Sequence, residues 1–262
     1  MSAQEAPSPA PSPAPRRRVG TLGLVASLPI LAALTVLYTL VLVALVAVVA
    51  RVSGAAALAP FARLPDGFGA ATREGPPGTV AFLVGSMLYV GAIAAVLTLA
   101  RAWGGPGWRS LVALERWRPR AVRDVALLTG AALVYGVVAG LVLGYVAPQT
   151  SPWDGVIKGR ALAIASFALI VVLAPIAEEL VFRGWAYTAL RARWGFGSAL
   201  GATSTIFALM HWEKTHIYAI AVLPVGVLLG VARERSGSVT ASMILHAAFN
   251  FCGWVALVAG IG

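Results

Sequence analysis

The sequence of 262 residues is 59% hydrophobic and 11% charged, with a formal net charge of +10. Soluble domains contain about 25% charged residues, so this composition excludes a soluble protein and indicates a membrane protein. The basic charge does not indicate nucleic-acid binding, because the arginines lie mostly between apolar runs, where membrane topology and anionic lipid headgroups account for them. The single cysteine, Cys252, excludes an intrachain disulfide and lies in an apolar segment, where packing is its expected role.

The chain is expected to begin with a disordered cytoplasmic tail over residues 1–18, because this stretch is rich in Pro, Ala and Ser and lacks apolar periodicity. An apolar stretch of about 30 residues follows and ends at Arg51, which is too long for the core of a signal peptide. It predicts a retained, tilted span or, alternatively, a hairpin.

Further apolar runs are long enough to cross a hydrocarbon core of roughly 30 Å as helices. The predicted spans lie at residues 78–100, 125–147, 161–190, 197–215, 217–232 and 238–259. The predicted fold class is therefore all-α, a polytopic helical membrane protein with seven spans, or eight if the first run is a hairpin.

The basic residues predict the orientation of these spans, because Lys and Arg are retained preferentially on the cytoplasmic side. With the N-terminus inside, 14 of the 20 basic residues fall on that side. The protein is therefore expected to be a multi-pass protein of the cell membrane with a cytoplasmic N-terminus. Residues 101–124 contain both arginines and tryptophans, which predicts either a helix lying on the inner leaflet or a solvated basic loop.

Ionisable residues interrupt the fourth predicted span in the stretch IAEELVFRG, residues 176–184. Unpaired, its two glutamates and one arginine would cost on the order of 8 kcal/mol on membrane insertion scales. Glu179 and Arg183 lie one helical turn apart in the acid-first order, so we expect them to form an ion pair. Glu178 lies about 140° away from Arg183 around the helix and is left available for chemistry. Pro175 removes a helical donor, which is expected to free the carbonyl of Val171.

Later spans contribute His211, one turn after Phe207, and His246, one turn before Asn250. Counted along the predicted helices at 1.5 Å per residue, Glu178 and His211 both lie roughly 20 Å into the membrane. His246 and Asn250 lie at comparable depth, so these polar side chains are expected to share one cavity.

These residues, in order, resemble the three motifs of the CPBP family, which includes type II CAAX prenyl proteases and bacteriocin-processing intramembrane proteases. The motif EExxxR corresponds to Glu178, Glu179 and Arg183; FxxxH corresponds to Phe207 and His211; HxxxN corresponds to His246 and Asn250. The resemblance covers about residues 160–255. It implies that residues 160–262 form the catalytic membrane core, preceded over residues 19–159 by spans that carry the basic loop.

The residue types suit peptide-bond hydrolysis, which needs an activated water, stabilisation of the oxyanion and a proton for the leaving amine. Glu178 with His211 can hold and deprotonate the water, while His246 and Asn250 can direct N–H donors at the oxyanion, as the resemblance also implies. Glu179, Arg183 and Phe207 are expected to position the helices. A divalent metal such as Zn²⁺ is the alternative, because Glu178, His211 and His246 match the ligand types of catalytic zinc sites.

The predicted function is an intramembrane endopeptidase that cleaves a peptide or membrane-protein substrate within the lipid bilayer. The alternative is a membrane scaffold or small transporter that uses the same polar cavity, because buried Glu and His also serve proton relays. Prenylated CAAX tails, bacteriocin leader peptides and regulatory membrane proteins all suit the family. The sequence leaves the substrate and the oligomeric state open.

The predicted topology places the N-terminus and the segment 101–124 in the cytoplasm. Single cysteines introduced into this segment, in a Cys252→Ser background, are expected to react with a membrane-impermeant thiol reagent only after the membrane is permeabilised. Labelling in intact cells would instead place the segment outside and overturn the topology.

Overall fold

The computed structural model describes residues 21–54, 59–62, 79–146, 159–212 and 217–259. The predicted tail at residues 1–18 lies outside these residues. The described residues form helices joined by short turns, without a strand among them, which confirms the predicted all-α class.

The elements follow one another along the chain as α-helices, one 3₁₀ turn (η3) and two π-helical segments (η4 and η5). Their bounds are α1 (Thr21–Ser53), α2 (Ala59–Ala62), α4 (Thr79–Gly104), η3 (Gly105–Gly107), α5 (Trp108–Leu111), α6 (Ala121–Val146), α7 (Arg160–Phe167), η4 (Ala168–Leu173), α8 (Ala174–Glu179), η5 (Leu180–Ala186), α9 (Tyr187–Leu209), α10 (Ile217–Ser236) and α11 (Val239–Ala259).

Six stretches among the described residues are long and apolar enough to cross a membrane, close to the predicted seven or eight. The first apolar run is one continuous helix, α1, rather than a hairpin. The difference in number arises at Gly195, where two predicted spans join within the helical run Arg160–Leu209. Gly195 has a φ of 79°, a left-handed conformation that glycine adopts readily, so the chain bends sharply there without an intervening loop.

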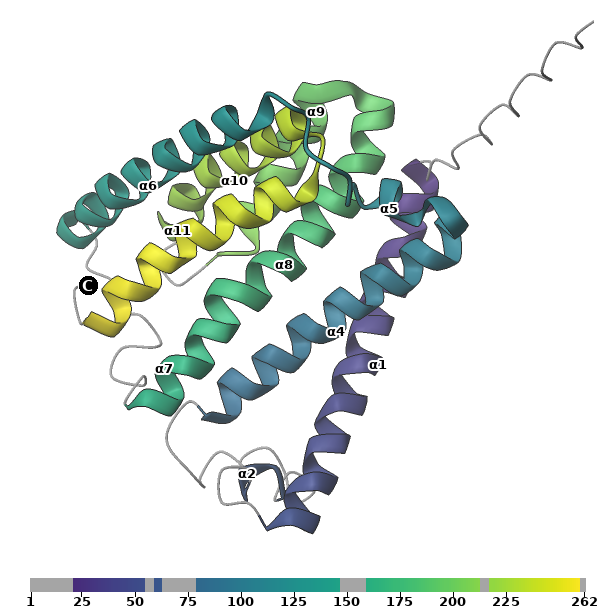
Figure 1. The fold of residues 1–262 in the computed structure, drawn as a ribbon, viewed down its shortest axis with the longest axis vertical. Helices are drawn as coiled ribbons and strands as arrows, with labels where there is room; N and C mark the ends of the chain where they lie inside the picture. Colours follow the sequence, from purple (N-terminus) through teal and green to yellow (C-terminus); the bar gives the residue numbers. More distant parts are fainter. Residues whose placement is uncertain (1–20, 55–58, 63–78, 147–158, 213–216, 260–262) are drawn as a thin grey trace, which may run out of the picture.

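The helices are arranged around the segment formed by α7, η4, α8 and η5, which runs between α4 on one side and α11 on the other (Figure 1). Helix α1 packs along α4 at the outer edge. Helices α6 and α10 pack against α11 and against each other, and α9 covers α10. The central segment therefore contacts helices from both halves of the chain.

The outer faces of the helices are apolar, as expected for contact with lipid. On α6, Leu127, Val134 and Leu141 are exposed, and on α1, Leu40 and Leu45 are exposed. Polar side chains are instead drawn inwards, where Glu179 and Arg183 are fully buried. The bundle thus has the apolar exterior and polar interior site of a membrane protein.

The segment 101–124 contains the end of α4, the turn η3, the short helix α5, a non-helical stretch over residues 112–120 and the first residues of α6. The Arg101 guanidinium lies 4.5 Å from the centre of the Trp108 ring, a cation–π contact that holds the end of α4 against α5. The structure therefore agrees better with the predicted basic loop than with a long interfacial helix.

Candidate active site

The two adjacent glutamates form the end of α8, and Arg183 follows one turn later in η5. Arg183 Nη1 donates to Glu179 Oε1 over 3.0 Å, and both side chains are fully buried. This contact confirms the ion pair that the spacing predicts. Glu178 takes no part in it, as the helix geometry requires.

Arg183 also connects η5 to the neighbouring helices. Its Nη2 donates to the backbone carbonyl of Gly226 in α10 over 2.8 Å. Its guanidinium carbon lies 4.5 Å from the centre of the Phe207 ring in α9. Burying a charge is expensive unless it is paired and hydrogen-bonded, so these contacts offset the desolvation of the arginine and hold α8, η5 and α10 together.

Glu179 is bonded to His246 as well as to Arg183. The distance from His246 Nδ1 to Glu179 Oε1 is 3.0 Å, and because a carboxylate accepts, Nδ1 carries the proton of this bond. The other ring nitrogen, Nε2, is thereby turned to Glu178, whose Oε2 lies 3.9 Å away. This separation is too long for a hydrogen bond but suits a small bridging group such as water.

Glu178 is the more accessible carboxylate, with 17% of its side chain exposed. Its Oε1 accepts a hydrogen bond of 2.8 Å from the hydroxyl of Tyr89 in α4. Tyr89 belongs to no motif and was missed in the sequence. In the sequence, Tyr89 is marked only by a hydroxyl within an apolar span. Ser86 has the same feature, but its hydroxyl donates to the Phe82 carbonyl of its own helix.

The Phe207 ring links the two histidines. Its centre lies 4.7 Å from that of the His211 ring and 5.7 Å from that of the His246 ring. His211 Nδ1 donates to the Phe207 carbonyl over 2.8 Å, which leaves its Nε2 available. Within the described residues, no hydrogen bond or ion pair joins His211 to Glu178. Similar depth in the membrane therefore did not bring these two side chains into direct contact.

Asn250 reaches a backbone carbonyl on the central segment, since its Nδ2 donates to Ile170 O over 2.9 Å. The local backbone explains why this carbonyl is available. In the π-helical register, the N–H of Ala174 donates to Leu169 O, and Pro175 has no N–H to offer Ile170. The sequence prediction assumed an α-helical register and placed the freed carbonyl at Val171, but the carbonyl that accepts a side chain is Ile170.

The zinc alternative requires three side chains that converge on one point. In the part of the chain that the structure describes, no group of three His, Cys, Asp or Glu residues is placed to hold a metal ion. Glu178 and His246 approach each other, but His211 does not join them as a third ligand. The arrangement therefore does not fit a metal held by these three residues.

The buried ion pair generates a prediction about stability. Replacing Arg183 with Ala leaves Glu179 as a buried, unpaired charge, and breaking such a pair costs about 3–5 kcal/mol. Arg183→Ala and Glu179→Gln are expected to lower the midpoint of thermal unfolding in detergent strongly, whereas Glu178→Gln is expected to leave it nearly unchanged. An equal loss of stability in Glu178→Gln would contradict this separation of the two glutamates.

Comparison with known proteins relates this site to a family. Residues 160–252 match the family model described as type II CAAX prenyl endopeptidase Rce1-like. An uncharacterized 24.3 kDa protein from Escherichia coli is 36% identical over 86 residues, which cover 32% of this chain and 40% of that protein. The chain thus matches less than half the length of this curated relative, and no solved structure matches it. The matched segment contains all three motifs, so this part of the chain is similar to the Rce1-like type II CAAX prenyl endopeptidases.

Proposed function

We propose that the protein is an intramembrane endopeptidase in which Glu178 activates the water that attacks the peptide bond. The observation that carries this proposal is the 3.9 Å separation between Glu178 Oε2 and His246 Nε2. Hydrolysis needs a base that activates the water and a donor that stabilises the oxyanion, one on each side of the substrate carbonyl. Two groups at this separation can act on the same carbonyl. The match of residues 160–252 to a peptidase family supports the same reaction.

Glu178 is the general base in this proposal. Its carboxylate takes a proton from the water as the water oxygen bonds to the carbonyl carbon, and the carbonyl π electrons move to oxygen. The resulting tetrahedral intermediate collapses when the carbon–nitrogen bond breaks. Glu178 returns the proton to the leaving amine. The carboxylate is suited to this cycle because it is partly exposed and is not neutralised by Arg183.

The two histidines and Asn250 have the remaining roles in the proposed reaction. The Phe207 carbonyl holds Nδ1 of His211, so Nε2 is left available, and we assign to Nε2 the role of orienting the water with Glu178. His246, held by Glu179, is the oxyanion donor through Nε2–H when its ring is protonated. Asn250 uses one N–H for the Ile170 carbonyl and retains a second N–H for the oxyanion.

The proposed chemistry is tested with Glu178→Gln, which keeps the shape of the side chain but removes the base. Comparing the membrane peptides of cells that express wild type or Glu178→Gln identifies a peptide whose cleavage stops. The purified proteins are then assayed on that peptide. We expect no measurable cleavage by Glu178→Gln, and normal cleavage by the control Glu115→Gln, whose glutamate is exposed and bonded to Ser110.

The same assay separates the other roles. Asn250→Ala is expected to retain activity lowered by about 10²- to 10³-fold, as is typical when one oxyanion donor is lost, whereas His211→Ala is expected to be inactive. Normal turnover by a folded Glu178→Gln protein would reject the general base. If wild type cleaves no membrane peptide, the scaffold or transporter becomes the better explanation.

Tyr89 is proposed as a positioning residue, because its hydroxyl orients the Glu178 carboxylate from a separate helix. A hydrogen bond to a charged group contributes about 1.5–3 kcal/mol, so Tyr89→Phe is expected to lower kcat by roughly 10- to 100-fold while KM and the unfolding midpoint stay unchanged. Tyr38→Phe is the matched control, because the Tyr38 hydroxyl bonds to Thr98 between α1 and α4, outside the site. A rise in KM with unchanged kcat would instead give Tyr89 a role in binding.

A further inference from the structure

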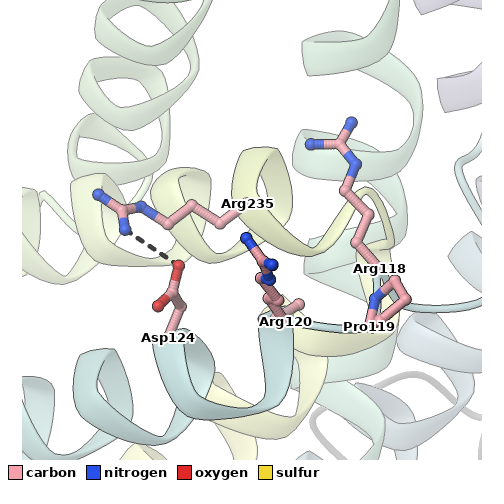
Figure 2. A pocket seen from close by; sticks show the side chains of 6 residues that line it. Arg118, Pro119, Arg120, Asp124 and Arg235 are labelled. Atoms are coloured by element: carbon pink, nitrogen blue, oxygen red, sulfur yellow. Dashed lines mark hydrogen bonds and ion pairs between the residues drawn. The ribbon is translucent and has the colours of Figure 1, made fainter.

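A second polar site lies where α6 begins and α10 ends. It is a shallow pocket of about 340 Å³. Figure 2 shows Arg120 between Arg235 and Arg118 at the first turn of α6. The lining residues are Arg118, Pro119, Arg120, Ala121, Asp124 and Arg235. None of them belongs to the three motifs, so this pocket is separate from the candidate active site.

The lining carries three guanidinium groups against one carboxylate. Arg235 Nη1 donates to Asp124 Oδ2 over 3.0 Å, and Arg118 Nη1 donates to the carbonyl of Glu234 over 2.9 Å. These bonds hold two of the arginines in place, while most of their five N–H donors remain available. Arg120 makes no hydrogen bond or ion pair with the residues that the structure describes. The pocket therefore has an excess of positive charge that the protein itself does not compensate.

The position of the pocket indicates where a ligand would come from. Helices α6 and α10 are both candidate membrane spans, so their ends lie at the level of the lipid headgroups. Val122 and Leu127 are more than 60% exposed on α6, directly after the pocket, and continue into the apolar outer face of that helix. The start of α6 adds the partial positive charge of a helix N-terminus. A molecule with an anionic head and an apolar tail fits this surface better than a free anion does.

We propose that the pocket binds the phosphate group of an anionic phospholipid whose acyl chains lie along α6. Guanidinium groups bind phosphate through paired, charge-assisted hydrogen bonds, and the uncompensated Arg120 is the principal ligand. A zwitterionic lipid brings its own ammonium group into the same arginine-rich pocket and binds more weakly. The proposal is independent of the proteolytic function.

The test uses the purified full chain in a non-ionic detergent, with short-chain phosphatidylglycerol, short-chain phosphatidylcholine or inorganic phosphate added at equal concentration. Lipid binding is measured by native mass spectrometry, and stability by the midpoint of thermal unfolding. We expect phosphatidylglycerol to bind and to raise the midpoint. Arg120→Gln is expected to weaken this binding roughly tenfold or more, because a charge-assisted contact is lost.

Two further variants make the result specific. Arg123→Gln is the matched control, because Arg123 is close in sequence but its side chain is 84% exposed and does not line the pocket. Arg120→Lys keeps the charge but loses the forked geometry, so intermediate binding is expected. Each variant is shown to be folded if, in the absence of lipid, its unfolding midpoint equals that of wild type.

The possible outcomes separate the sources of the phosphate. Binding of inorganic phosphate as tight as that of phosphatidylglycerol would support the phosphate site but reject the lipid as its natural source. Equal binding of phosphatidylglycerol and phosphatidylcholine, or an equal loss in Arg123→Gln and Arg120→Gln, would overturn the proposal.

Discussion

The candidate site depends on one buried carboxylate oxygen, Glu179 Oε1, which accepts hydrogen bonds from both Arg183 and His246. Through Arg183 this oxygen is linked to the Gly226 carbonyl of α10, and through His246 to α11. Placing charges in an apolar bundle is costly, and only a nearly satisfied network makes the arrangement stable. The same network determines the orientation of the His246 ring and so presents its second nitrogen to Glu178.

The backbone of the central segment is adapted to the same site. Two π-helical stretches, η4 and η5, flank α8, and π-helical turns are frequent at functional sites because they change which side chains and carbonyls face a cavity. Pro175 leaves the Ile170 carbonyl without a helical donor, and Asn250 supplies one from α11. A backbone irregularity that would be expensive in lipid is thus satisfied by a side chain from a neighbouring helix.

The charged groups of the protein lie in two separate environments. Glu178 and its partners lie in the interior of the bundle, where Glu179, Arg183 and His246 are buried. The arginines around Arg120 lie at the ends of spans, where lipid headgroups supply counter-charges. Of this second group only Arg235 is paired with a carboxylate, that of Asp124, so the group keeps a net positive charge, which the proposed anionic lipid would balance.

The sequence by itself determined the helical class, most of the spans and the ion pair between Glu179 and Arg183, because apolar run length and one-turn spacing are local properties of a chain. It also predicted that polar residues lie at similar depth. Only the tertiary structure decided that Tyr89 bonds to Glu178, that His246 rather than His211 faces Glu178, and that two predicted spans join at Gly195. The depth of a residue along a helix does not determine which helices lie next to it or how that helix is rotated about its axis. Both depend on packing between residues far apart in the chain.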